Sequence, residues 1–361
     1  MADMDLDLSA DAVTLTEQLV NIPSVSLDEA AIADAVEAAL RGLPHLDVTR
    51  HGHTIVARTT LGLGERVVIA GHLDTVPLND NLPARREDTA DGGILHGLGT
   101  CDMKGGDAVM LKLAADLTEP NRDLTFIFYE AEEVDSKHNG LRKLTVSDPD
   151  LVEADFAILM EPSNAAVEAG CQGTMRVDVR TTGERAHSAR SWKGVNAIHL
   201  ASPILARLND YVAREPELDG LTYHEGLNAT GIRGGVAGNV IPDECVVEVN
   251  FRFAPDRSES DAEAFVRDFF EGFEVTVTDL AAGAMPGLDR PAAKAFVEAV
   301  GGGVAPKFGW TDVAQFTRLG VPAVNFGPGD PMFAHKQDEH VPIEHIERCE
   351  RTLKEWLGGQ A

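Results

Sequence analysis

The chain has no hydrophobic run near the ~18 residues of a membrane-spanning helix, and residues 1–5 lack the apolar segment of a signal peptide. It is also poor in positive charge, because 31 lysines and arginines stand against 59 acidic residues, a net charge of −28 at pH 7. Such a charge disfavours nucleic acid and anionic membrane surfaces, since both present negative phosphates. We therefore expect a cytoplasmic protein that binds neither nucleic acid nor membranes.

Cysteine is scarce as well. The four cysteines, Cys101, Cys171, Cys245 and Cys349, are widely spaced and form no CxxC pair. This spacing argues against a structural zinc knuckle or a redox dithiol. We expect four buried, reduced thiols.

The length of 361 residues, with 43% hydrophobic residues, suits two globular domains. Short apolar runs at 67–70, 124–129, 156–160 and 323–326 are typical of strands in a mostly parallel sheet that is covered on both faces. Helical patterns separate them. One of these is expected at about 106–117, and another follows a capping box at Ser26–Glu29 and runs to about Leu40. The pattern predicts an α/β domain.

A different pattern occupies the middle of the chain. Alternating strands are expected around 177–182, 227–235, 245–253 and 274–278, and helices at 197–208 and 258–270. The order β-α-β-β-α-β is that of a ferredoxin-like α+β unit. We predict an inserted domain at residues 178–288, within a discontinuous catalytic domain at 1–177 and 289–361.

Histidine and carboxylate side chains follow several predicted strands at the points where those strands end. His72 and Asp74 follow the strand that ends at Ala70, and Glu132 and Glu133 follow the strand that ends at Tyr129. Glu161 follows the strand that ends at Met160, and His335 lies in a loop after the strand that ends at Phe326. Asp102 lies in a separate glycine-rich loop before a helix. Because sites in open α/β sheets form outside the carboxyl ends of the strands, we expect these groups to meet at one edge.

Each of these residues alone has an ordinary structural interpretation. A His-x-Asp pair is often a surface turn, Glu132-Glu133 a solvated acidic pair, and Glu161 a strand end. His335 could be an exposed loop histidine, and Asp102 could be the N-cap of the following helix. Their joint placement at strand ends favours a metal site.

The residue types suit zinc, which binds imidazole nitrogen and carboxylate oxygen. Two zinc ions ~3.5–4 Å apart can polarise a carbonyl and lower the pKa of a water. Asp74 can accept the second ring N–H of His72 and fix its tautomer. A carboxylate that is not a ligand must accept the proton of the water, and Glu132 is the candidate.

Five segments together resemble the zinc aminoacylase and carboxypeptidase superfamily, the M20 metallopeptidases. They are Gly71–Pro77, Asp102–Gly106, Glu130–Glu133, Met160–Ser163 and Ala334–Glu339, in this order over nearly the whole chain. The resemblance implies a zinc-exopeptidase-like fold and two Zn²⁺ per chain, for which Co²⁺ can substitute. It implies His72 and Glu161 on one ion, Glu133 and His335 on the other, Asp102 as the bridge and Glu132 as the general base.

Within the superfamily the likeness is strongest to the succinyl-diaminopimelate desuccinylases. It is carried by Ala186–His199, Gly238–Glu244, Asn250–Arg257 and Asn325–Gly329. This likeness implies that the inserted domain forms a homodimer, that His187 reaches across it to the oxyanion, and that Asn239 and Arg252 bind the substrate. Residues 308–312 depart from the glycine-, threonine- and serine-rich stretch of other desuccinylases, and Leu98 replaces an arginine common in relatives. No substrate contact is assigned at 308–312.

A small anionic N-acyl amino acid needs local positive charge in so acidic a protein. Arg190, Arg233 and Arg252 are candidates, since arginine offers two parallel donors to a carboxylate. The alternative for Arg252 is an ion pair with a neighbouring acid.

Three functions follow from these residues. The first is metal-dependent hydrolysis of N-succinyl-LL-2,6-diaminopimelate to succinate and LL-diaminopimelate, in lysine and cell-wall diaminopimelate biosynthesis. The second is another deacylase or a dipeptidase of the same superfamily, such as acetylornithine deacetylase. The third is a non-catalytic metal-binding dimer, which the presence of Glu132 disfavours because a binder needs no base.

Overall fold

The computed structural model describes residues 5–90 and 92–358. Residues 1–4, part of the N-terminal segment for which no signal peptide is expected, lie outside the described residues. The chain forms two compact units. The first comprises Met1–Ala169, Gly287–Ala305 and Thr311–Ala361, and the second comprises Gly170–Pro286 and Pro306–Trp310. Among the described residues no helix is long and apolar enough to cross a membrane.

The first unit is built on an eight-stranded sheet with the order β1-β2-β6-β3-β7-β18-β8-β17. Its strands are β1 (Asp47–His51), β2 (Thr54–Arg58), β3 (Arg66–His72), β6 (Asp123–Tyr129), β7 (Phe156–Pro162), β8 (Val167–Ala169), β17 (Val304–Pro306) and β18 (Ala323–Gly327). The four central strands β6, β3, β7 and β18 are parallel neighbours, and the strands beside them are antiparallel. These four are the predicted apolar runs.

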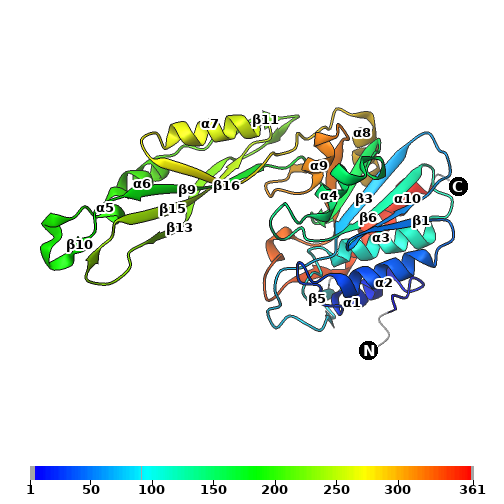
Figure 1. Ribbon diagram of the computed structural model, residues 1–361. Coiled ribbons are helices and arrows are strands. Elements are labelled where there is room, and N and C mark those ends of the chain that lie inside the picture. The colour runs from blue at the N-terminus through cyan, green and yellow to red at the C-terminus, as the bar shows by residue number, and fades with distance from the viewer. Residues whose placement is uncertain (1–4, 91, 359–361) are drawn as a thin grey trace. The chain divides into compact units, whose positions relative to one another are not determined.

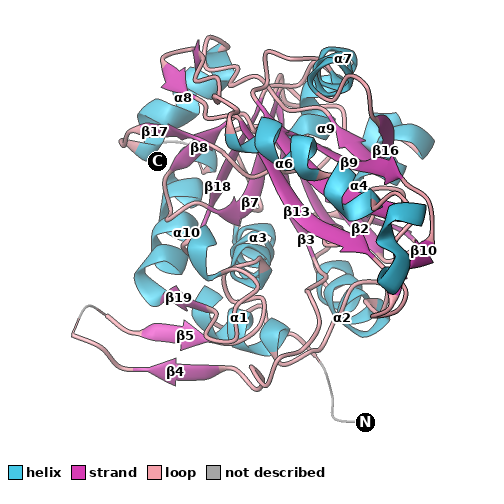
Figure 2. Cartoon of the chain, turned by 90° about the vertical axis from the view of Figure 1, so that its left-hand side faces the viewer, coloured by secondary structure: helices cyan, strands magenta, loops and turns pink. Residues whose placement is uncertain are grey.

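Helices cover both faces of this sheet, with α3 on one face and α4 and α9 on the other (Figure 1). The helices of the unit are α1 (Ala12–Val20), α2 (Ala30–Arg41), α3 (Lys104–Asp116), α4 (Gly140–Ser147), α8 (Pro291–Val300), α9 (Val313–Arg318), α10 (Ile343–Leu357), and the 3-10 turns η1 (Pro149–Leu151) and η3 (Pro331–Phe333). Burial on both faces explains the unbroken apolar character of the central strands. The hairpin of β4 (Arg85–Glu87) and β5 (Ile94–His96) pairs with β19 (His340–Pro342) in a small separate sheet (Figure 2).

The second unit contains a four-stranded antiparallel sheet with the order β13-β15-β9-β16. Its elements are β9 (Gly173–Thr182), β10 (Ala186–His187), η2 (Ser188–Lys193), α5 (Ala197–Leu200), α6 (Ser202–Asn209), β11 (Glu217–Leu218), β12 (Leu221–Thr222), β13 (Gly226–Gly234), β14 (Val240–Ile241), β15 (Glu244–Phe253), α7 (Glu259–Phe269) and β16 (Glu274–Ala281). One face of the sheet buries a core that includes Val177, Val247 and Phe251 beneath Ile204 and Val266 of the helices. The predicted α/β class and the ferredoxin-like arrangement are confirmed.

Two local predictions were wrong. Ser26 does not cap α2, because its hydroxyl donates instead to Asp74 Oδ2 at 2.7 Å, and the helix begins after Glu29 without a side-chain cap. The expected helix 197–208 is split into α5 and α6 at Ala201, since Pro203 lacks the N–H that would continue the helix. The four cysteines are free and buried, as expected.

Candidate metal centre

Asp74 ties the end of β3 to the loop after β6. Its carboxylate accepts hydrogen bonds from the backbone N–H of Glu132 at 2.9 Å and of Glu133 at 3.1 Å, and from the hydroxyl of Ser26. His72, the last residue of β3, has Nδ1 3.0 Å from the backbone oxygen of Asp74 and 3.5 Å from its carboxylate. The carbonyl of Asp74 thus makes the shorter contact to the ring, which leaves Nε2 of His72 directed toward Asp102.

Asp102 lies between two histidines from different parts of the chain. Its Oδ1 is 3.1 Å from His72 Nε2, and its Oδ2 is 3.3 Å from His335 Nε2. It does not cap α3, because Met103 occupies the N-cap position. Each oxygen of the Asp102 carboxylate therefore lies beside the imidazole of a different histidine.

Three groups of side chains bring one ligand atom each within 4.8 Å of one another. They are His72 with Asp102 and Glu161, Asp102 with Glu133 and His335, and His72 with Glu132 and Glu133. The first two groups share Asp102. All five predicted ligands thus lie together at the carboxyl ends of the central strands, and the imidazole and carboxylate donor set fits zinc.

The electrostatics of this cluster call for a cation. Burial raises the pKa of Glu132 well above its usual range, and the neighbouring Glu161 raises it further. Hydrogen bonds with Asp102 and Glu133 raise the pKa of His335 to about 10. Like charges held out of water destabilise one another, so a bound metal cation would relieve the repulsion.

The backbone is in the left-handed region at two positions beside these groups. Ala131, just before Glu132, has φ 58°, and His335 has φ 64°. Such conformations are uncommon for residues other than glycine and cluster at functional sites. Both positions therefore mark backbone strain next to the candidate ligands Glu133 and His335.

Sequence reasoning missed Glu339. Its buried carboxylate accepts the backbone N–H of both Cys101 and Asp102 at 3.1 Å and so holds the loop of the shared carboxylate. The only available signal was its place four residues after His335, in one of the quoted segments.

The predicted substrate residues all lie in the second unit, at two ends of its sheet. His187 pairs with Val240 in the β10-β14 ladder, the Ser188 N–H donates to the Asn239 carbonyl, and Arg190 lies in η2. Arg252 lies near the far end of β15, eight residues from Glu244, where β15 begins. At ~3.3 Å per residue these ends are about 26 Å apart.

Arg252 and Arg233 differ in their partners. Arg252 donates from Nε to Asn250 Oδ1 at 3.1 Å, and among the described residues it makes no ion pair. Arg233 is paired with Asp178 at 2.6 Å and with Glu248. Arg233 is therefore not a free cation for substrate, contrary to the prediction, whereas Arg252 retains unused donors.

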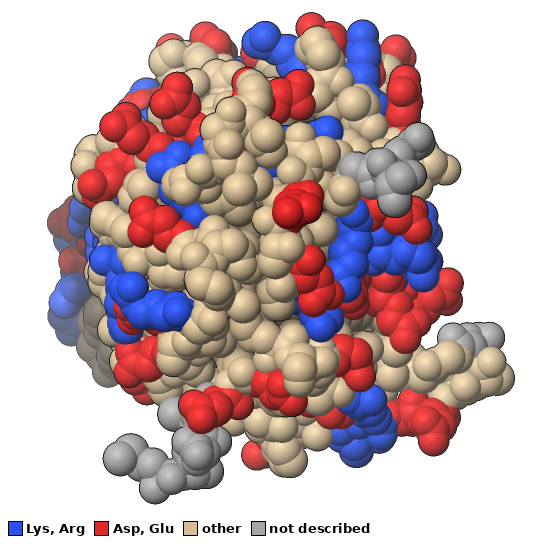
Figure 3. Space-filling model, turned by 90° about the vertical axis from the view of Figure 1, so that its right-hand side faces the viewer, with Lys and Arg blue, Asp and Glu red and all other residues tan. Residues whose placement is uncertain are grey.

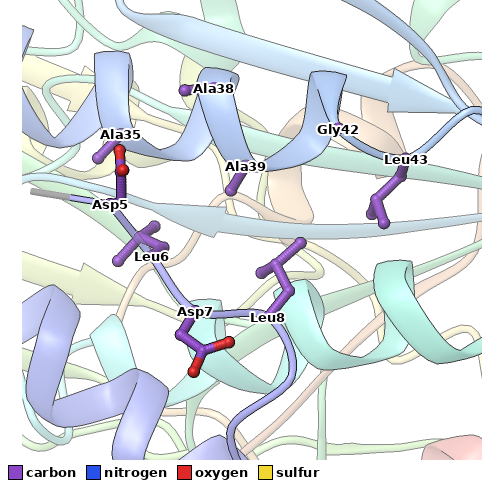
Figure 4. A pocket seen from close by; sticks show the side chains of 9 residues that line it. All are labelled: Asp5, Leu6, Asp7, Leu8, Ala35, Ala38, Ala39, Gly42 and Leu43. Atoms are coloured by element: carbon purple, nitrogen blue, oxygen red, sulfur yellow. The ribbon is translucent and has the colours of Figure 1, made fainter.

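A hollow of about 410 Å³ lies elsewhere in the first unit, between residues 5–8 and α2 (Figure 4). Its walls are Leu6, Leu8, Leu43 and small residues of α2, and its only acids are Asp5 and Asp7. None of the predicted site residues lines it.

The chain belongs to peptidase family M20/M25/M40, whose pattern matches residues 68–358. This family is metal-dependent, and the chain is an amidohydrolase. The predicted family resemblance is thereby confirmed.

Similar proteins include desuccinylases over nearly the full length. A protein of Mycobacterium tuberculosis, provisionally named succinyl-diaminopimelate desuccinylase DapE, is 55% identical and covers 98% of this chain and 100% of its own. The succinyl-diaminopimelate desuccinylase of Corynebacterium glutamicum is 48% identical, over 98% of this chain and 97% of its own. An acetylornithine deacetylase of Myxococcus xanthus is 31% identical over 80% of this chain and 78% of its own.

Solved structures share the fold. A Staphylococcus aureus tripeptidase has a TM-score of 0.78 at 21% identity and covers 98% of both chains. The Bacillus subtilis YXEP protein, described as a dinuclear metal-binding peptidase of family M20, has a TM-score of 0.70 at 17% identity over 96% of both chains.

Proposed function

We propose that this enzyme hydrolyses the N-succinyl amide of N-succinyl-LL-2,6-diaminopimelate, releasing succinate and LL-diaminopimelate for lysine and cell-wall synthesis. The observation that carries this proposal is the 55% and 48% identity, over 98% of the chain, to proteins named for that activity. The direct experiment is to measure succinate release from this substrate by the purified, metal-loaded protein. No release under conditions that turn over another N-acyl amino acid would refute the proposed substrate.

The chain's own residues divide the chemistry among them. His72 and Glu161 would hold one metal ion, Glu133 and His335 the other, and Asp102 both. When bound, the ions would polarise the amide carbonyl and lower the pKa of the attacking water. Glu132 would take the proton of that water and return it to the leaving amine nitrogen. Asp74 holds the His72 ring and the backbone of Glu132 and Glu133 in place through the contacts described above.

We expect two metal ions per chain. Because Asp102 presents one oxygen to each histidine, the two sites should fill as a coupled pair. Chelation should abolish activity, and Zn²⁺ or Co²⁺ should restore it. Metal analysis at saturating Zn²⁺ should approach two ions per chain; a single tight site with full activity would show that the bridging role of Asp102 is wrong.

A homodimer through the second unit is supported by its surface. Large apolar side chains are exposed on and around η2, α5, α6 and β13, and they are Trp192, Val195, Ile198, Leu200, Leu205 and Ile232. Strand β13 is also an edge strand of its sheet, with one side free for pairing. Exposed apolar side chains gathered on one region of a surface are typical of protein–protein contacts.

The dimer would also reconcile the positions of the substrate residues. His187 and Arg252 of one chain lie too far apart for one small molecule to touch both, so we propose that His187 serves the site of the partner subunit. Mixing His187→Ala with Glu132→Gln should then restore activity, because one site of each mixed dimer has both native groups. With equal amounts and random exchange, about a quarter of the wild-type activity is expected.

The matched control mixes Glu132→Gln with His335→Ala. Both of these residues are proposed to act within one chain, so no mixed dimer regains an intact site. If the His187→Ala mixture gives no more activity than this control, despite verified subunit exchange, His187 does not act across the dimer.

A further inference from the structure

Asp312 has an unexpected hydrogen-bonding arrangement. It occupies the N-cap position of α9, where an aspartate normally accepts N–H groups of its own helix, yet its side chain makes no such bond. Its Oδ2 instead accepts the side-chain amide N–H of Asn139 at 2.8 Å, across 173 residues of sequence. The carboxylate is fully buried, so this contact fixes it without help from solvent.

Asn139 closes the loop that carries Glu132 and Glu133. Its other amide atom, Oδ1, accepts the N–H of Arg142 at 2.8 Å and so caps α4. The next residue, Gly140, donates its N–H to the carbonyl of Glu130 at 2.8 Å, which joins the two ends of the loop. Because Asn139 uses one end of its amide for the cap and the other for Asp312, its orientation is determined by both.

Asp312 also acts through its charge on the last residue of the strand that enters the loop. Tyr129 is the last residue of β6, and its buried hydroxyl has no hydrogen-bond partner among the described residues. Burial and then the charge of Asp312 raise the pKa of that hydroxyl. The ring of Tyr129 meets that of His72 edge to face, with centroids 6.1 Å apart. Asp312 thus holds the exit of the Glu132-Glu133 loop by a hydrogen bond, and it acts on the residue at the loop's entry through its charge.

We propose that Asp312 is a positioning residue: through Asn139 it sets the loop that aims Glu132 at the reacting water. This rests on the proposed role of Glu132 as the base. Asp74 also accepts the backbone N–H groups of Glu132 and Glu133, so two buried carboxylates hold the loop. Loss of the Asp312 contact should then misplace the base more than it disturbs the metal ligands, which have further contacts of their own.

The test compares four variants by kcat, KM and metal content. Asp312→Ala removes the acceptor and leaves the Asn139 amide unpaired, and kcat should fall at least ~10-fold with KM and metal content nearly unchanged. Asp312→Asn keeps an acceptor oxygen and should lose only a few-fold. Asn139→Asp sets two buried carboxylates against each other and should lose as much as Asp312→Ala.

The exchange variant Asn139→Asp/Asp312→Asn is decisive. It reverses donor and acceptor while aspartate still caps α4, so it should recover most of the kcat that Asn139→Asp loses. A merely structural role would change thermal stability and leave kcat per folded, metal-loaded molecule untouched. The matched control is Asp123→Asn, at the opposite end of β6, where a buried carboxylate accepts the Thr59 hydroxyl and the N–H groups of Leu61 and Leu63.

The outcomes separate this inference from the proposed function. Unchanged kcat in Asp312→Ala, or no recovery in the exchange variant, would overturn the positioning role. An active Glu132→Gln enzyme would instead overturn the role of Glu132 as base, whatever Asp312 does. Any N-acyl amino acid that the enzyme turns over serves as the assay substrate.

Discussion

Glu132→Gln should lose at least ~10²-fold in kcat and keep its metal, because a glutamine cannot accept a proton from the attacking water. Glu133→Gln should show the opposite pattern. The Glu133 Oε1 atom is 2.7 Å from His335 Nε2, inside the group that also contains Asp102, so its loss should weaken metal binding first. Steady-state kinetics with metal analysis of the same preparations separates the two effects.

These neighbouring glutamates are each other's control. They share the loop after β6, and their backbone N–H groups donate to the same carboxylate, so general damage to the loop should affect both variants alike. One atom each of His72, Glu132 and Glu133 also lie close enough together to hold a metal ion. A role of Glu132 as a metal ligand is therefore the competing assignment. Metal loss in Glu132→Gln together with metal retention in Glu133→Gln would reverse the two roles.

The sheet could be predicted from the sequence because its signal is local. Strands β3, β6, β7 and β18 are buried on both faces, so each is a short apolar run without alternation. In a parallel sheet their carboxyl ends share one edge, and that rule alone places His72, Glu133 and Glu161 together. The strands of the second unit could also be predicted, because only one of their faces is buried and apolar and polar residues therefore alternate along them.

The contacts that hold the site in place could not be predicted in this way. Ser26 looked like a helix cap, but its partner Asp74 lies 48 residues further along the chain. Glu339 supports the loop of Asp102 from 237 residues away, and Asp312 looks like an ordinary cap of α9. These bonds depend on how loops meet in space, and neither periodicity nor spacing carries that information.

The enzyme should prefer a substrate with a carboxylate on its acyl group. The net charge of −28 repels anions at long range, and Figure 3 shows acidic and basic side chains interspersed over one face, so binding requires a cation with free donors. A site built for succinate would leave such a cation unpaired when an acetyl group binds, and an unpaired buried charge costs more than the ~1–3 kcal/mol of a neutral group. We expect kcat/KM for N-succinyl-diaminopimelate to exceed that for N-acetylornithine by at least ~10²-fold. Comparable turnover of the two would leave only a general two-metal deacylase.

Arg252 is the cation we expect to matter most. Burial and then the nearby charge of Arg176 lower its pKa, and the charge of Asp279 offsets this only in part. Arg252 makes no ion pair with a described acid, so its guanidinium has donors left for an anionic substrate. Arg252→Ala should lower kcat/KM about 10- to 100-fold, the equivalent of ~1.5–3 kcal/mol for a hydrogen bond to a charged group, without loss of metal. Arg252→Lys should recover only part of the lost kcat/KM, because lysine lacks the two parallel donors.

Arg233→Ala is the matched control on the same sheet. The Arg233 guanidinium is already paired with Asp178 and Glu248, so its loss should leave kcat/KM unchanged. Equal kcat/KM in the Arg252→Ala and Arg233→Ala enzymes would show that Arg252 does not contact the substrate.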